Sequence, residues 1–199
     1  KVVADFKVIS HSNLKNEKIV SASGFGGNYA RECGLLGLAI SPDFKKTGFV
    51  YVVYSPLDKS VNRLSRFTFK NKIWENPSEK IILEVPHERK DKACHESGCL
   101  EFDSEGNLYW AIGDNTNPWG TAAGGAPQNE EDPINNAMRT SANSADLRGG
   151  IMRITPHKDG SYSIPNGNLF DDEVSRKEIY VKGCRNPFRI SIDKKTNAL

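Results

Sequence analysis

A strand–turn–strand pattern occurs twice in this sequence and begins a third time. In the first copy, an apolar strand (residues 34–43) ends in Ser-Pro-Asp and is followed by an aromatic-rich strand (residues 49–55). The second copy has the same order, with strands at residues 99–103 and 108–112, and the third begins at residues 186–193. A chain of recurring β-units is restricted to folds that bury a core by stacking one unit on the next.

The spacing of the copies favours β-propeller blades. Ile40, Phe102 and Ile192 occupy matching positions in the three copies. Propeller repeats are about 40–50 residues long, and the longer intervals seen here indicate loop insertions on one face. Chance resemblance between unrelated strand–turn–strand units is the alternative interpretation.

The rest of the sequence predicts an all-β protein with one long irregular insertion. Residues 115–146 are rich in Asn, Gly, Ala and Pro, and only residues 135–139 indicate a short helical turn. Such a long irregular stretch is either a functional lid or disordered. Further strands are predicted from β-branched and aromatic residues at 63–69, 81–85, 150–154 and 178–181.

Composition excludes several classes of function. The chain has 199 residues, a formal net charge of +2 and 26% charged residues, with no basic stripe of the kind that binds nucleic acid. No apolar run approaches the about 20 residues that span a membrane. A hydrolase lacks support, because neither a Gly-x-Ser-x-Gly elbow nor an HExxH motif is present.

Residues with reactive side chains precede the first strand of each copy. They are Glu32 and Cys33, then Cys94 and His95, then Cys184 and Arg185. The innermost strands of a propeller run along its central channel, so equivalent positions in successive blades converge at one end of that channel. We therefore expect an acid, an imidazole and a guanidinium to face a common cavity.

His95 is the candidate base of this cavity. It lies at the mouth of a predicted strand between small and acidic residues, where an imidazole can accept a proton near neutral pH. The alternative is a histidine that only caps the strand.

The four cysteines, Cys33, Cys94, Cys99 and Cys184, allow three pairings if all are bridged. Converging positions make a Cys33–Cys94 disulfide plausible, which would imply an oxidising compartment. Two thiols near a cavity are the alternative, and Cys99 fits a small buried apolar residue. Structural zinc is disfavoured because the spacing lacks a CxxC pair, and no metal ligands are assigned.

Several motifs in order resemble the glucose/sorbosone dehydrogenase family, the soluble pyrroloquinoline quinone (PQQ)-dependent sugar dehydrogenases. The match runs from about Glu32 to Asp193. Its motifs include Gly-Leu-Leu-Gly-Leu-Ala at 34–39, His-Glu-Ser-Gly at 95–98, Gly-Asp at 113–114, Leu-Arg-Gly-Gly-Ile-Met-Arg-Ile at 147–154 and Arg-Asn-Pro-Phe at 185–188.

The resemblance implies a six-bladed propeller with PQQ and calcium over the channel mouth, the calcium ligands lying outside this chain. Six blades need at least about 240–300 residues. We therefore expect residues 1–199 to form a single partial domain, about half of the propeller, from the N-terminal blades of a longer chain.

The resemblance also implies roles for individual residues. His95 matches the catalytic base, Arg185 and Asn186 match the pair beneath the quinone, and Glu32 falls where the family contacts sugar. Two positions depart from the family pattern: Cys94 replaces an acidic residue before the base, and Phe188 replaces a residue that is often polar.

The function implied is PQQ-dependent oxidation of a sugar or polyol hydroxyl. His95 would take the hydroxyl proton as hydride leaves for the quinone, Arg185 would stabilise the charge that develops there, and an electron acceptor would reoxidise the cofactor. A periplasmic or extracellular location is expected. The alternative is a non-catalytic propeller that binds a partner and keeps only the family scaffold.

Overall fold

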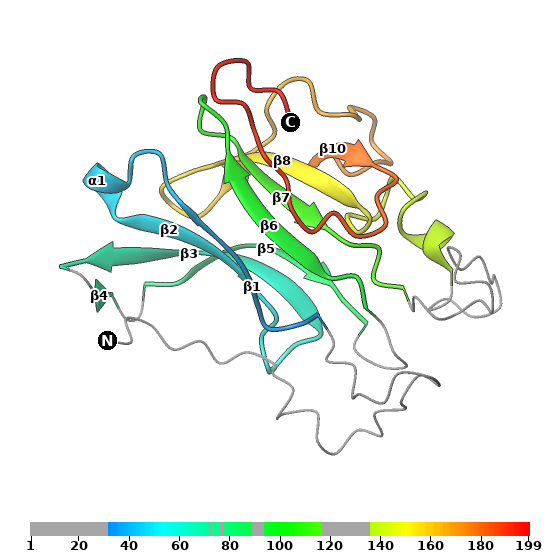
Figure 1. Ribbon diagram of the computed structural model, residues 1–199, viewed down its shortest axis with the longest axis horizontal. Coiled ribbons are helices and arrows are strands. Elements are labelled where there is room, and N and C mark those ends of the chain that lie inside the picture. Colours follow the sequence, from blue (N-terminus) through cyan, green and yellow to red (C-terminus); the bar gives the residue numbers. More distant parts are fainter. Residues whose placement is uncertain (1–31, 72, 76–77, 89–93, 117–135) are drawn as a thin grey trace.

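The computed structural model describes residues 32–71, 73–75, 78–88, 94–116 and 136–199, which form two antiparallel β-sheets (Figure 1). The first sheet contains five strands: β1 Leu35–Ile40, β2 Phe49–Tyr54, β3 Val61–Lys70, β4 Ile73–Trp74 and β5 Lys80–Pro86. Hydrogen-bonded neighbours follow the order β1, β2, β3, β5, and the short β4 also pairs with β3.

The second sheet repeats this topology. Strands β6, β7, β8 and β10 are successive neighbours, and the two-residue β9 pairs with β8 as β4 pairs with β3. The strands are β6 Ser97–Phe102, β7 Leu108–Ile112, β8 Gly150–Pro156, β9 Tyr162–Ser163 and β10 Ile179–Lys182. The repeat seen in the sequence is therefore a structural repeat, and the all-β prediction is confirmed.

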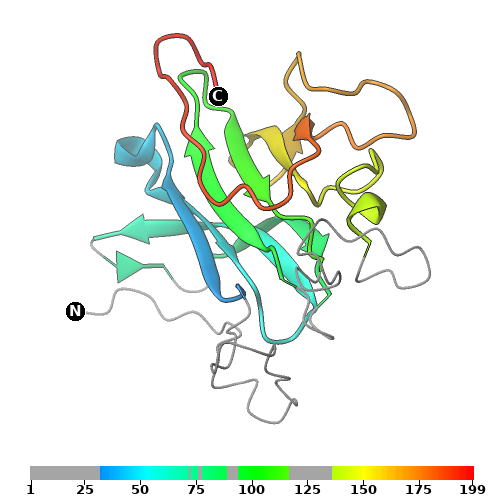
Figure 2. The same ribbon diagram turned by 45° about the vertical axis from the view of Figure 1, so that its right-hand side comes forward.

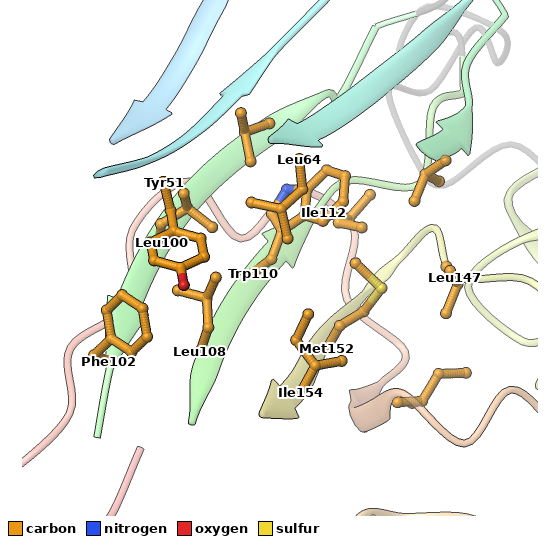
Figure 3. Close-up of a cluster of buried hydrophobic side chains, with 13 residues drawn as sticks. Tyr51, Leu64, Leu100, Phe102, Leu108, Trp110, Ile112, Leu147, Met152 and Ile154 are labelled. Carbon is orange, nitrogen blue, oxygen red and sulfur yellow. The ribbon is translucent and has the colours of Figure 1, made fainter. Parts of the chain in front are cut away.

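The two sheets pack face to face through one apolar core (Figure 3). Tyr51 and Leu64 from the first sheet meet Leu100, Phe102 and Trp110 from the second, and the rings of Tyr51 and Phe102 pack edge to face at 5.2 Å. Alternating β-branched and aromatic residues on the strands supply this face because successive side chains point to opposite sides of a sheet.

Strands β1 and β6 lie side by side at the centre of the molecule (Figure 2). The backbones are in close contact at Gly37, where a Cβ atom would lie 2.0 Å from the carbonyl oxygen of Gly98. The predicted apolar strand needs glycine here because any side chain would separate the sheets.

Each sheet has a second apolar face. On the second sheet, Tyr109, Ala111 and Ile151 pack against Ile190 and Ile192 of the C-terminal segment. Segment 186–193, predicted as a strand, runs along this face without strand hydrogen bonding, so that prediction is wrong. A strand requires a hydrogen-bonded neighbour, and no strand of the described part of the chain pairs with it.

The remaining predicted elements have mixed outcomes. The predicted strands agree with the observed ones to within about two residues at most ends. The predicted turn at 135–139 coincides in part with a 3₁₀ helix, Ala137–Arg139, and the short helix α1, Phe44–Thr47, was not predicted. Most of the predicted insertion at 115–146 lies outside the described residues. Within the described ranges, no helix is long and apolar enough to cross a membrane.

Candidate functional site

The candidate site lies where β6 begins and β7 ends. Ser97 pairs with Ile112, and two residues further out the same register sets His95 opposite Asp114. The backbones stay paired there, since the Asn115 N–H donates to the His95 carbonyl (3.2 Å). The hairpin therefore brings together an imidazole and a carboxylate that are far apart in sequence.

His95 and Asp114 form a buried pair. His95 Nδ1 lies 2.7 Å from Asp114 Oδ1, and the two residues are only 4% and 1% exposed. A carboxylate accepts, so Nδ1 carries the proton and the lone pair of the neutral ring is on Nε2. With this tautomer Nε2 is the ring nitrogen that is able to accept a proton, and the Asp114 carboxylate would stabilise the resulting cation.

The backbone at this pair is held in a conformation that L-residues rarely adopt. His95, Ser97 and Asn115 have φ values of 58°, 57° and 55°. Such left-handed positions cost about 1–3 kcal/mol each and cluster at functional sites. Gly113 allows the close packing here, because a Cβ atom would lie 1.9 Å from the His95 carbonyl oxygen.

Glu32 joins three segments of the chain. Its Oε2 accepts from the Glu96 N–H (2.9 Å) and from Asn186 Nδ2 (3.0 Å). The Cys94 thiol also hydrogen-bonds to this carboxylate, and burial together with the negative charge of Glu32 raises the pKa of Cys94 to about 12. In this structure Glu32 thus binds protein groups, and its predicted contact with sugar stays a prediction.

Arg185 and Asn186 approach the pair through the backbone. The carbonyl oxygen of Arg185 accepts from the Asp114 N–H (2.8 Å), while the Arg185 side chain is exposed. The Asn186 amide nitrogen donates to Glu32, and its Oδ1 is buried beside Gly113. The structure therefore brings Glu32, His95 and Arg185 to one place, and their roles there stay predictions.

Sequence reasoning missed four polar residues of this region. Asp114 and Thr116 hold His95, Asn115 joins Glu88 to Cys94, and the buried Glu96 carboxylate accepts from the Ser55 hydroxyl (3.2 Å). Asp114 could have been found, because hairpin register sets it opposite His95. The others depend on side-chain directions that strand periodicity does not give.

The predicted Cys33–Cys94 disulfide is wrong: Cys33, Cys94, Cys99 and Cys184 form no disulfide. The Cys94 thiol faces the Glu32 carboxylate instead, which explains why it makes no bridge. The location inferred from that bridge stays a prediction. Among the described residues, no three His, Cys, Asp or Glu side chains are grouped to hold a metal ion.

Part of the site fits a quinone cofactor. An exposed arginine, Arg185, whose backbone contacts Asp114, and an imidazole with a lone pair on Nε2 suit an electron-accepting anion and a hydroxyl substrate. The Asn186 side chain is not oriented to bind a quinone in its present rotamer, because its NH₂ group donates to Glu32 and its Oδ1 is buried.

Comparison with known proteins identifies relatives along most of the chain. The profile of the family described as Glucose / Sorbosone dehydrogenase matches residues 6–199. The Hedgehog-interacting protein of Homo sapiens is 26% identical over 207 residues, covering 94% of this chain and 26% of that protein. The HIPL1 protein of Arabidopsis thaliana is 35% identical over 112 residues, covering 50% of this chain and 14% of that protein. The chain thus spans about a quarter or less of the length of these relatives.

Two solved structures share the fold. An oxidoreductase from Thermus thermophilus, described as a glucose dehydrogenase, superposes with a TM-score of 0.62 at 24% identity, covering 85% of this chain and 44% of that one. The PQQ-bound aldose sugar dehydrogenase of Streptomyces coelicolor superposes with a TM-score of 0.54 at 24% identity, covering 78% of this chain and 38% of that one.

Proposed function

Because the chain belongs to the glucose/sorbosone dehydrogenase family, we propose that it forms part of an oxidoreductase that oxidises a sugar or polyol hydroxyl with PQQ. The buried His95–Asp114 pair carries this proposal, since the bond from Nδ1 to Asp114 directs the second ring nitrogen, Nε2, to act as the acceptor. The PQQ-bound relative of the same fold supports the choice of cofactor.

We also infer that the two sheets are successive blades of a six-bladed propeller. Two features support this: the sheets share one strand topology, and they stack face to face with β1 beside β6. The outer face of the first sheet carries Leu38 and Ile40, both more than half exposed in this structure. In the full-length protein, Leu38→Lys should lower stability by about 1.5–3 kcal/mol, the value of burying a leucine side chain; no loss would contradict a closed ring.

His95 acts as the base in this scheme. Its Nε2 takes the proton of the substrate hydroxyl while the hydrogen on the same carbon leaves as hydride, with both electrons of the C–H bond, and the C=O bond forms. When bound, PQQ supplies the hydride acceptor. Asp114 keeps Nδ1 protonated, holds the ring in one orientation and stabilises the imidazolium formed. Calcium would be held by residues outside this chain.

Arg185 is the residue of this chain best suited to hold the cofactor. Its side chain is exposed, and the bond from the Asp114 N–H to the Arg185 carbonyl fixes its backbone next to the His95–Asp114 pair. A permanent positive charge there favours the negative charge that develops on reduction of a quinone.

The test uses the full-length protein with added PQQ and calcium, a panel of sugars and polyols, and a reducible dye. His95→Gln should lower turnover by about 10²–10⁴-fold, the contribution of a positioned base. His157→Gln is the matched control, because His157 is exposed on the turn between β8 and β9. Equal turnover of His95→Gln and wild type would exclude His95 as the base.

A binding role is the second candidate, and the likeness to Hedgehog-interacting proteins supports it. Under this alternative the protein binds a protein partner and the His95–Asp114 pair is part of the scaffold. It predicts no dye reduction with any substrate at saturating PQQ and no PQQ binding by calorimetry.

A further inference from the structure

Thr116 is buried against the His95–Asp114 pair. Its backbone N–H and its hydroxyl both donate to Asp114 Oδ1, at 3.0 and 2.8 Å. This is the same oxygen that accepts from His95 Nδ1. The Thr116 side chain is fully buried, so these bonds are shielded from water.

The backbone of Thr116 is itself fixed. Its carbonyl oxygen accepts from the Cys94 N–H (3.2 Å), so the strand pairing of the hairpin continues past Asp114 as far as Thr116. The hydroxyl oxygen lies 3.5 Å from His95 Nδ1, which is too long for a strong hydrogen bond. Thr116 therefore acts on His95 through Asp114 and not directly.

Three donors converging on one carboxylate oxygen restrict the side chain of Asp114. Rotation of the carboxylate would break two bonds to Thr116 together with the bond to His95. Hydrogen bonds to a charged acceptor are roughly twice as strong as neutral ones, and burial increases this difference. The hydroxyl thus limits Asp114 to the rotamer that orients the imidazole.

We propose that Thr116 is a positioning residue of the site: its hydroxyl fixes the Asp114 carboxylate and so holds His95 in the orientation needed for proton transfer. The kinetic part of this inference rests on the proposed function. The positioning part is independent of it, because the His95–Asp114 hydrogen bond exists whether or not the protein is an enzyme.

The test compares Thr116→Val and Thr116→Ser in the full-length protein. Valine keeps the shape and the backbone N–H but removes the hydroxyl, whereas serine keeps the hydroxyl. The matched control is Thr155→Val, which removes a threonine hydroxyl that donates to Asn107 (2.6 Å) away from the site.

The first readout is the Nδ1–H proton resonance of His95, assigned by its disappearance in His95→Gln. Thr116→Val should shift and broaden this resonance, because the carboxylate then samples other rotamers. Thr116→Ser and Thr155→Val should leave it in place. An unchanged resonance in a folded Thr116→Val protein would overturn the proposal. If Thr116→Val does not fold, the same comparison is made between Thr116→Ser, which keeps the hydroxyl, and Thr116→Ala, which removes it.

The second readout is steady-state kinetics. Thr116→Val should lower kcat about tenfold, as loss of one charge-assisted hydrogen bond implies, with KM changed less than about twofold. Thr116→Ser should recover most of the loss. A change in KM alone would overturn the positioning role. If the wild-type protein shows no dehydrogenase activity, only the proposed function fails, and the resonance of His95 still decides the role of Thr116.

Discussion

Replacing Glu32 by Gln tests whether this residue holds the site together or contacts substrate. The carboxylate accepts from the Glu96 N–H and from Asn186 Nδ2 at 2.9 and 3.0 Å. Both donors bind Oε2, and Asn186 Nδ2 also donates to Oε1 (3.2 Å). A glutamine oxygen at the Oε2 position is neutral, so both hydrogen bonds lose the contribution of the charge, and the glutamine NH₂ group replaces the acceptor Oε1 with a donor that faces Asn186 Nδ2.

The magnitude follows from these contacts. A hydrogen bond to a charged group contributes about 1.5–3 kcal/mol, and Glu32 is partly exposed, so we expect Glu32→Gln to lower the free energy of unfolding by about 1–3 kcal/mol. Asn186→Ala removes the other partner, and the two changes should couple by at least about 0.5 kcal/mol in a double-mutant cycle.

The assay is urea unfolding of the full-length protein, with the loss read from the midpoint at constant m. Glu101→Gln is the control, since Glu101 makes a partly exposed ion pair with Lys194 (3.7 Å) that contributes about 0–1 kcal/mol. An unchanged midpoint together with a large increase in KM for sugar would refute the argument and assign Glu32 to the substrate.

Three further predictions concern packing, the thiols and pH. Gly37→Ala should lower the urea midpoint strongly, because its Cβ would lie 2.0 Å from the Gly98 carbonyl oxygen; a midpoint equal to wild type would contradict the close contact of β1 and β6. All four thiols should titrate in denaturant without reductant, whereas native Cys94, with its pKa raised to about 12 by burial and Glu32, should react with thiol reagents far more slowly at pH 8 than it does after unfolding. Burial lowers the pKa of Lys182 from 10.5 to about 8, so between these pH values the unfolded chain binds the extra proton and stability should rise with pH. The unfolding free energy of wild type minus that of Lys182→Gln should therefore be larger at about pH 10 than at about pH 7.5. The same value at both pH values would exclude a lowered pKa of Lys182.

The fold was largely predictable because its strands are regular. Residues 49–54 and 108–112 are continuous β-branched and aromatic runs, and both form strands with those bounds. Segment 186–193 has a similar composition but does not pair as a strand. Composition shows that a segment suits a strand, whereas strand formation also depends on a neighbour that lies elsewhere in the chain.

The site was predictable only in part. Glu32 and His95 precede the strands β1 and β6, and they meet near Arg185 as the repeat implied, although the segment after Arg185 forms no strand. The partners of these residues were not foreseen: Glu32 binds Asn186, and His95 binds Asp114. Side-chain pairings at a site depend on rotamers and on the backbone at left-handed positions, and residue spacing determines neither.

The backbone conformation of His95 allows a test of whether the imidazole is kept for chemistry or is only part of a scaffold. A residue at φ 58° is most stable as glycine, which adopts this conformation at no steric cost. A scaffold with no use for an imidazole gains stability from glycine there, while a catalytic site keeps the imidazole at the expense of strain. Comparing His95→Gly with His95→Ala isolates the backbone contribution, since both remove the ring. We expect the glycine variant to be more stable by about 1 kcal/mol in urea unfolding. An alanine variant of equal stability would show that no strain is stored at His95 and would remove this argument for catalysis.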